Sequence, residues 1–289
     1  MRGDHSMTAC PVCDSVPRGY RHPWLLRCAC GLLSASFPIA IPSTPTETRL
    51  DESQRASGLE PLRRINNASL LRAIARHTKR GASLLDVGSG PGFLLDQAMA
   101  DGFRVEGIEP DANVFSATQG RGVPVRNGFF PDVLRPGETF DVIVFNDVLE
   151  HIPNLSGTLE AAYKALNPGG VLCLNCPDKR GLFFRMAAAL DRLGVSAPYS
   201  RLWQQGLPSP HLWYFSPPLL NRVAERANFA LLQEVRLETI ELHGLWARIR
   251  YADEGLLTSI TSYVFAAASY PLAQLLPSDA TACLYRGPL

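Results

Sequence analysis

The stretch Ser83-Leu-Leu-Asp-Val-Gly-Ser-Gly-Pro-Gly-Phe93 decides the fold of this chain. Its first five residues are mostly apolar and predict a short, buried strand of a parallel sheet. Three glycines follow at Gly88, Gly90 and Gly92, and the residues from Phe93 to Ala100 have helical spacing. A strand, a glycine-rich turn and a helix predict the beginning of a βαβ unit. Such a turn lets the backbone approach a bound molecule closely, and the helix N-terminus offers free N–H groups to a negative charge.

The spacing of the glycines excludes two common nucleotide-binding loops. A nicotinamide dinucleotide fingerprint reads G-x-G-x-x-G, and its third glycine would fall at Phe93. A phosphate-binding P-loop needs Lys followed by Ser or Thr, which this loop lacks. The pattern Asp86-x-Gly88-x-Gly90-x-Gly92 instead resembles the first motif of the class I S-adenosylmethionine (SAM) methyltransferases. An ordinary strand-to-helix turn is the alternative, so the neighbouring motifs decide.

The second motif agrees with SAM binding. Residues 104–108 predict a second strand, which ends at Glu109-Pro110-Asp111. Glu109 follows the glycine loop by about 20 positions, the separation that such a unit gives its ribose-binding carboxylate. Two carboxylate oxygens suit two ribose hydroxyls, whereas the alternative is a solvated Glu in a turn. The resemblance predicts a SAM-binding set of Asp86, Gly88, Ser89, Gly90, Gly92, Glu109, Pro110, Phe129, Phe130 and Asn146.

Phe129 and Phe130 belong to this set because they follow a short predicted strand at residues 123–128. Related enzymes place residues near the adenine ring at this point, and an aromatic contact with adenine suits both. Packing in the core is the alternative for each of them.

The fourth predicted strand, Phe140 to Phe145, ends in Asn146-Asp-Val-Leu-Glu-His-Ile-Pro153. This sequence resembles the fourth-strand motif of the ubiquinone-type O-methyltransferases. Since the carboxyl ends of parallel strands line the ligand crevice, Asn146 and Asp147 are expected where the acceptor meets the methyl group. His151 is a candidate general base, because the pKa of an imidazole lies near neutrality. A packing or capping role for His151 is the alternative.

Two later segments agree with the same family. Asn167-Pro-Gly-Gly170 precedes a fifth predicted strand, and Pro210-His-Leu-Trp-Tyr-Phe-Ser216 resembles a stretch of the small-molecule and polysaccharide branch. Between them, residues 179–210 are expected to cover the substrate. The resemblance makes His211 a site residue, with a structural role as the alternative, and the predicted catalytic set is Asp147, His151 and His211.

Four cysteines near the N-terminus predict a small metal-binding module. Cys10-Pro-Val-Cys13 has the spacing of a zinc knuckle, while Cys28-Ala-Cys30 is one residue shorter than usual. We expect one structural zinc on Cys10, Cys13, Cys28 and Cys30, with His22 as a spare ligand. A module this small needs a metal for folding energy. The alternative is a ribbon that has lost its metal.

The composition is that of a globular enzyme. The chain has 289 residues, of which 46% are hydrophobic, and a formal net charge of +1. Nothing in this balance favours nucleic acid as a partner. The polar N-terminus and the use of cysteine indicate a cytoplasmic protein without a secretory signal. Polar residues in the apolar stretch 256–276 argue against a membrane span and leave a homodimer or another surface contact open.

Together these motifs identify a class I SAM-dependent methyltransferase. The resemblance implies an α/β fold, with a doubly wound, mostly parallel seven-stranded sheet. The predicted division is a zinc-ribbon-like module and linker at 1–45 and a methyltransferase domain at 46–289. The expected function is methyl transfer from SAM to a small-molecule or saccharide acceptor, at O or N. The alternatives are a SAM-binding protein without catalysis that acts as a scaffold, and a ribosomal-RNA methyltransferase.

Overall fold

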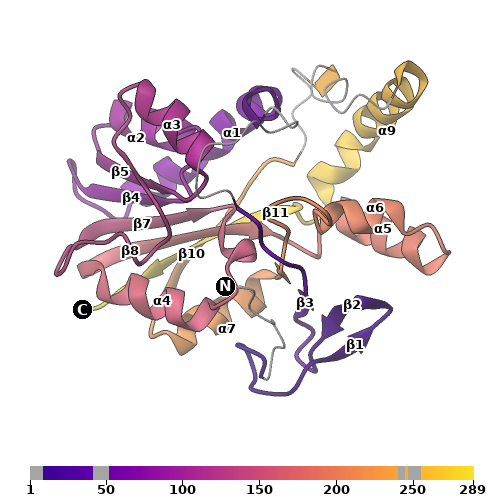
Figure 1. Ribbon diagram of the computed structural model, residues 1–289, viewed down its shortest axis with the longest axis horizontal. Coiled ribbons are helices and arrows are strands. Elements are labelled where there is room, and N and C mark those ends of the chain that lie inside the picture. The colour runs from indigo at the N-terminus through magenta and orange to yellow at the C-terminus, as the bar shows by residue number, and fades with distance from the viewer. Residues whose placement is uncertain (1–8, 42–51, 240–244, 247–254) are drawn as a thin grey trace.

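A computed structural model describes residues 9–41, 52–239, 245–246 and 255–289 (Figure 1). Its main sheet has seven strands in the order β10-β11-β8-β7-β4-β5-β6, and β11 alone runs antiparallel to its neighbours. The predicted doubly wound, mostly parallel sheet is therefore confirmed. The strands are β4 (Ser83–Val87), β5 (Arg104–Glu109), β6 (Val125–Asn127), β7 (Phe140–Asn146), β8 (Leu166–Pro177), β10 (Ala230–Arg236) and β11 (Ala280–Arg286).

Helices cover both faces of this sheet. Figure 1 shows α1 (Glu52–Ala75), α2 (Phe93–Ala100) and α3 (Ala112–Gly120) on one face, and α4 (Leu155–Lys164) and α7 (Pro217–Arg226) on the other. Along β7, Val142 and Val144 belong to one apolar core, while Ile143 and Phe145 belong to the other. This alternation follows from the two-residue period of a strand and explains why the buried strands read as continuous apolar runs.

The strand order places the ligand crevice. β4 pairs in parallel with β5 on one side and with β7 on the other, so the direction of winding reverses between β4 and β7. In open α/β sheets, ligands bind at such a switch point, outside the carboxyl ends of the strands. The glycine loop after β4 and the segment that begins at Asn146 after β7 therefore lie side by side.

One local expectation was wrong. The predicted turn at Asn167-Pro-Gly-Gly170 instead lies inside β8. The C-terminus explains this difference, because the N–H of Gly169 donates to the carbonyl of Pro288 and the N–H of Gly287 donates to that of Gly170. Elsewhere, α1 is one continuous helix, although it contains Pro61.

The cysteine module continues into the rest of the chain through a second sheet. Its strands β1 (Arg18–Tyr20), β2 (His22–Arg27) and β3 (Leu33–Ala35) are antiparallel, and β3 pairs with β9 (Trp213–Tyr214). Leu25 of the module is fully buried in the apolar core that also contains Phe145. The predicted boundary between residues 45 and 46 lies outside the described residues, so the division into two domains stays a prediction.

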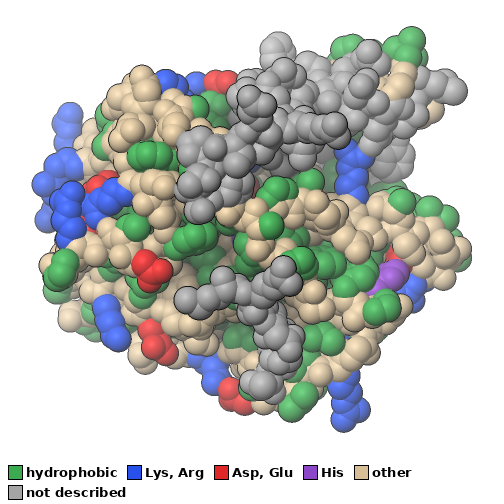
Figure 2. Space-filling view, viewed as in Figure 1, with side chains coloured by type: hydrophobic (Ala, Val, Ile, Leu, Met, Phe, Trp, Pro, Cys, Tyr) green, Lys and Arg blue, Asp and Glu red, His purple; other side chains and the backbone are tan. Residues whose placement is uncertain are grey.

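The segment 179–210 forms α5 (Leu182–Arg192) and α6 (Ala197–Leu202). Next to it, α9 (Leu256–Leu275) packs Tyr263 and Tyr270 toward Phe183 of α5. The other face of α9 exposes Leu256, Ile260, Val264 and Leu275, and Figure 2 shows apolar side chains at the upper right, where α9 lies. Among the described residues, none of the helices combines the length and the hydropathy that crossing a bilayer requires. A homodimer through 256–276 stays a prediction.

Candidate functional site

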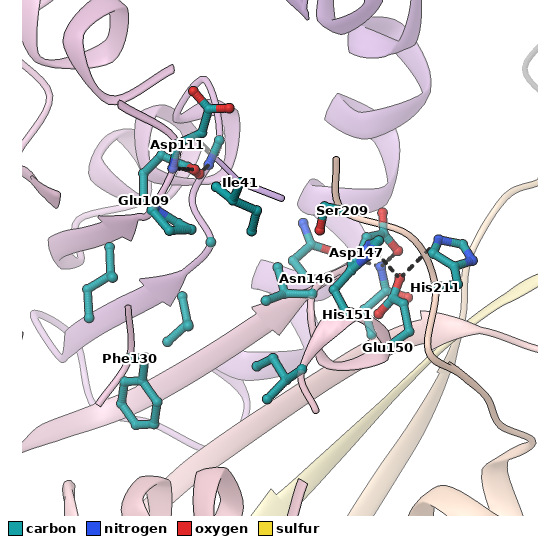
Figure 3. A pocket seen from close by; sticks show the side chains of 18 of the residues that line it. Ile41, Glu109, Asp111, Phe130, Asn146, Asp147, Glu150, His151, Ser209 and His211 are labelled. Atoms are coloured by element: carbon teal, nitrogen blue, oxygen red, sulfur yellow. Dashed lines mark hydrogen bonds and ion pairs between the residues drawn. The ribbon is translucent and has the colours of Figure 1, made fainter. Parts of the chain in front are cut away.

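A large cavity opens at the carboxyl ends of β4, β5 and β7. Its volume is about 1190 Å³, which exceeds the roughly 300–1,000 Å³ of a usual small-ligand pocket and leaves room for two ligands. Figure 3 shows Glu109 and Asp111 on one side of it and Asn146, Asp147, Glu150, His151 and His211 on the other. The predicted residues that line it are Gly88, Gly90, Glu109, Pro110, Phe129, Phe130, Asn146, Asp147, His151 and His211.

Three predicted SAM-binding residues, Asp86, Ser89 and Gly92, do not line the cavity. Asp86 and Ser89 are buried beneath the loop. Gly92 caps the N-terminus of α2 with φ of +81°, and a Cβ there would lie 3.3 Å from side-chain carbons of Thr118 and Val123. These positions support the loop from behind.

Glu109 ties the glycine loop to the second strand. Its Oε2 accepts a hydrogen bond of 2.8 Å from the N–H of Gly90, and its Oε1 accepts one of 2.8 Å from the N–H of Asp111. The carboxylate of Asp111 in turn caps α3. Glu109 thus lies at the cavity wall with its carboxylate in a fixed orientation.

Close packing around the loop requires two glycines. A Cβ at Gly88 would lie 2.6 Å from Cγ2 of Val148, which belongs to the loop after β7. A Cβ at Gly107 on β5 would lie 2.7 Å from Oγ of Ser89. The sequence analysis missed Gly107, because a glycine within a strand does not reveal which backbone approaches it.

Asp86 places a buried carboxyl behind the glycine loop. The side chain is buried, and its Oδ1 accepts no hydrogen bond from the described residues. Burial, assisted by the negative charge of Glu109, raises the pKa of Asp86 to about 8. A buried carboxyl without a partner is costly, and a nearby ammonium group would stabilise its charged form. The amino group of SAM, bound on the cavity side of the loop, would supply such a charge, so the residues fit the expected ligand.

Phe129 and Phe130 both line the cavity but differ in burial. Phe129 is 51% exposed. Phe130 is partly buried and meets Phe145 edge to face, with ring centroids 5.5 Å apart. Phe130 therefore combines the core-packing role with a place on the cavity wall.

Asn146 and Asp147 are held in place by hydrogen bonds to amide side chains of other elements. Nδ2 of Asn175 donates to Oδ1 of Asn146 at 2.7 Å and to Oδ1 of Asp147 at 2.9 Å. Nδ2 of Asn146 donates to Oδ1 of Asn67 on α1 at 3.2 Å. Asp147 has φ of +58°, a conformation that is uncommon for a residue with a Cβ. Three elements thus orient Asn146 and Asp147; the sequence analysis missed Asn67 and Asn175, although Asn175 lies at a carboxyl strand end.

His151 and His211 meet each other and Glu150. The ring centroids of the two histidines are 4.8 Å apart. Oε1 of Glu150 lies 3.9 Å from Nε2 of His151 and 4.0 Å from Nε2 of His211. Glu150 is fully buried, and burial raises the pKa of its carboxyl well above the usual range, with the charge of Asp147 adding to the shift. These three side chains are also close enough to one another to hold one metal ion.

The tautomer of His151 follows from its hydrogen bond. Its Nδ1 lies 2.9 Å from the carbonyl oxygen of Pro210, which can only accept. Nδ1 therefore carries a proton, and the neutral ring presents Nε2 as an acceptor. The sequence analysis missed Glu150 as a site residue, although it belongs to the motif that contains His151.

The linker after the cysteine module forms part of the cavity wall. Ile39 and Ile41 line the cavity together with Leu207 and Pro208. The N–H of Ala40 donates to the carbonyl of Pro208 at 2.8 Å. The linker is thus connected to the segment 207–208 by a backbone hydrogen bond. Its two isoleucines, Ile39 and Ile41, line the cavity.

The four N-terminal cysteines come together as predicted. Their Sγ atoms all lie within 4.8 Å of one another, with 3.7 Å between Cys10 and Cys30 and 3.2 Å between Cys13 and Cys28. Tetrahedral Zn–S bonds of about 2.3 Å place sulfurs about 3.8 Å apart, so the cluster fits one zinc ion. His22 is not a spare ligand, because its Nε2 bonds Asp191 at 2.8 Å.

A family model described as a methyltransferase domain matches residues 60–234, which is more than half of the chain. The chain belongs to this methyltransferase family. The match begins in α1 and ends in β10, and it contains the glycine loop, Glu109 and the histidine pair.

Curated relatives agree with this membership. The chain is 40% identical over 129 residues to the ubiquinone biosynthesis O-methyltransferase of Paramagnetospirillum magneticum, over 39% of this chain and 52% of that protein. It is 28% identical to the enzyme of the same name from Methylobacterium sp., over 59% of this chain and 68% of that protein. The chain thus spans about half the length of the first of these relatives and about two thirds of the second.

Solved structures share the fold. A SAM-dependent methyltransferase from Thermotoga maritima matches with a TM-score of 0.54 and 15% identity, over 82% of this chain and 94% of that one. Phosphoethanolamine N-methyltransferase 2 of Haemonchus contortus, in complex with S-adenosylhomocysteine, matches with a TM-score of 0.55 and 14% identity, over 89% of this chain and 63% of that one. At these identities the likeness concerns the fold alone.

Asp86→Asn should change how the stability of the ligand-free protein depends on pH. Between the ordinary carboxyl pKa of about 3.9 and about 8, folded Asp86 keeps a proton that the unfolded chain releases. This group therefore lowers the free energy of unfolding as the pH rises through that window. Asn cannot titrate, so urea denaturation at several pH values should show a flatter dependence. The exposed Asp101→Asn is the control, and an unchanged slope in Asp86→Asn would contradict a neutral Asp86.

Proposed function

We propose that this protein transfers a methyl group from SAM to a hydroxyl or amino group of a small-molecule or saccharide acceptor. The observation that carries the proposal is the single cavity that joins the glycine loop and Glu109 to Asn146, Asp147 and the histidine pair. Its volume suits a nucleoside ligand and an acceptor together. The names of the curated relatives favour oxygen as the acceptor atom.

The residues at and beneath the glycine loop have the properties that SAM requires. Asp86 offers a buried carboxyl beneath the loop, Gly90 leaves open space where a side chain would project, and Glu109 presents a fixed carboxylate to the ribose. When bound, SAM supplies an electrophilic methyl group. The protein's own contribution is to orient the acceptor and to exclude water.

On the other side of the cavity, Nε2 of His151 is proposed to accept the proton that leaves the acceptor. The carbonyl of Pro210 holds the ring by its other nitrogen. Burial raises the pKa of the Glu150 carboxyl well above its usual range, and its Oε1 lies 3.9 Å from Nε2 of His151. Glu150 can then stabilise the imidazolium that forms. Asn146 and Asp147, held by Asn175, are proposed to orient the acceptor.

Zinc on Cys10, Cys13, Cys28 and Cys30 is proposed as a structural component. The N–H of Ser15, followed by the thiol of Cys28, lowers the pKa of Cys13 to about 6, which favours the thiolate that binds metal. The ion would supply folding energy to the module and so hold Ile39 and Ile41 at the cavity. The cytoplasmic location expected from the sequence is part of the same proposal.

A scaffold that binds SAM without turnover is the second candidate function, since the glycine loop, Asp86 and Glu109 argue for SAM binding but do not prove turnover. Radiolabelled SAM incubated with a panel of phenols, sugars and primary amines separates the two. Methylation of any acceptor in the panel supports the enzyme. SAM binding with no transfer to any of them supports the scaffold.

Gly90→Val should abolish SAM binding. Gly90 has φ of +52°, and nothing lies within 4 Å of a Cβ placed there, so a valine side chain would project into the cavity. Titration calorimetry measures the affinity, and circular dichroism checks the fold. Gly102→Val is a matched control, because Gly102 has φ of +86° and the same open space but does not line the cavity. If Gly90→Val bound SAM with wild-type affinity, this loop would not be the SAM-binding site.

His151→Ala should lower kcat by about 10²–10⁴-fold, the range of a general base, while the SAM affinity stays unchanged. Initial rates at saturating acceptor measure kcat, using whichever member of the panel is methylated. His77→Ala is the control, because His77 lies at the end of α1 and contacts Gln233 outside the cavity. A normal kcat with a lower melting temperature would show that His151 only packs.

Elemental analysis should find about one zinc per chain in the purified protein. Cys10→Ser should lose the metal and melt at a lower temperature, because a thiolate ligand of the cluster is removed. Cys283→Ser is the control, since Cys283 is buried in the main sheet and not in the cluster. A folded wild type that contains no metal would show that the ribbon is degenerate.

A further inference from the structure

A second cavity lies where the cysteine module meets α5, outside the methyl-transfer site. Its volume is about 190 Å³, roughly six times the share of one water in the liquid. Figure 1 shows β1 and β2 beside α5 and α6, and ion pairs from the module to α5 close this junction. Its charged lining residues are Arg21, Arg27, Lys179, Asp191 and Arg192.

The single carboxylate of this cavity is already occupied. Oδ2 of Asp191 accepts from Nε of Arg21 at 2.8 Å, and its Oδ1 lies 2.8 Å from Nε2 of His22. Asp191 is 4% exposed and has its pKa lowered below the usual range, so it is ionised. Its negative charge therefore offsets Arg21 and His22, and Asp191 forms no ion pair with the other cations of the cavity.

Arg27 and Lys179 contact neutral groups in this cavity. The guanidinium of Arg27 lies over the ring of Tyr20, 5.1 Å from its centroid. Nζ of Lys179 donates to the carbonyl oxygen of Gly31 in the cysteine module. Among the residues that the structure describes, Arg27, Lys179 and Arg192 form no ion pair with a carboxylate.

Lys179 is the residue whose position needs an explanation. Lys179 is partly buried in the turn that follows β8, and this burial lowers its pKa. A negative charge on Cys30 or on Asp178 opposes that shift, while the charge of Arg27 adds to it. An anion in this cavity would lie among three cations that have no carboxylate partner there, and its interaction with each of them would be favourable.

We propose that this cavity binds a phosphate group, either as free phosphate or as the end of a phosphate monoester. Arg27 and Arg192 would offer planar donor pairs, and Lys179 would add a point charge, which is the combination that phosphate oxygens favour. Lys179 lies two residues after Pro177, which lines the methyl-transfer cavity. A phosphate bound here therefore lies behind the same segment of chain that borders the acceptor.

Titration calorimetry with inorganic phosphate, in a phosphate-free buffer, tests the site. One saturable site is expected in the wild type. Arg27→Gln and Lys179→Met should each weaken phosphate by about tenfold to a hundredfold, the scale of one lost hydrogen bond to a charged group. Arg185→Gln is the control, because Arg185 is exposed on α5 and does not line the cavity. SAM affinity should be unchanged in all three variants, which separates this site from the proposed function.

The source of the phosphate is distinguished by a second titration with glucose 6-phosphate. Tighter binding of the ester, in competition with phosphate, indicates a monoester ligand, whereas binding of phosphate alone indicates the free ion. If Lys179→Met fails to fold, Arg27→Gln and Arg192→Gln carry the test, since both side chains are exposed. Absence of saturable phosphate binding in the wild type, or equal affinity in the folded variants, would overturn the proposal.

Discussion

The site depends on the close approach of two loops, one after β4 and one after β7. Gly88 contacts the side chain of Val148 so closely that a Cβ would lie 2.6 Å from it. Because the two strands are neighbours at the switch point, this contact joins the glycine loop to the segment that carries Asn146 and His151. The arrangement follows from the strand order, and every functional distance in the cavity depends on it.

Buried carboxyl groups mark both sides of the cavity. Asp86 lies below the glycine loop and Glu150 lies between two imidazoles, and burial raises the pKa of both. Each would be unfavourable in a protein that used it for packing alone, since an apolar residue of similar size costs less to bury. Under the proposed function each group has a cationic partner, the ammonium of SAM for Asp86 and an imidazolium for Glu150.

The cysteine module is built into the methyltransferase rather than attached to it. Strand β3 of the module pairs with β9, and Leu25 of the module packs in the same core as Phe145. Nζ of Lys179 donates to the carbonyl of Gly31 in the module. The linker then brings Ile39 and Ile41 to the cavity. The position of the module is thereby coupled to the shape of this part of the cavity, and the proposed structural zinc would act on the cavity through the same contacts.

The sequence by itself determined the parallel sheet, the glycine loop and the positions of Glu109 and His151. These features depend on local patterns: apolar runs, glycine spacing, and carboxyl ends of strands that share one edge. The spacing of four cysteines also predicted one metal-binding cluster. The structure places their Sγ atoms within 4.8 Å of one another. The tertiary structure alone decided the contacts between distant segments: Asn67 with Asn146, Glu150 with His211, and Asp191 with His22. No local pattern encodes such pairs, because the packing of separate elements brings them together.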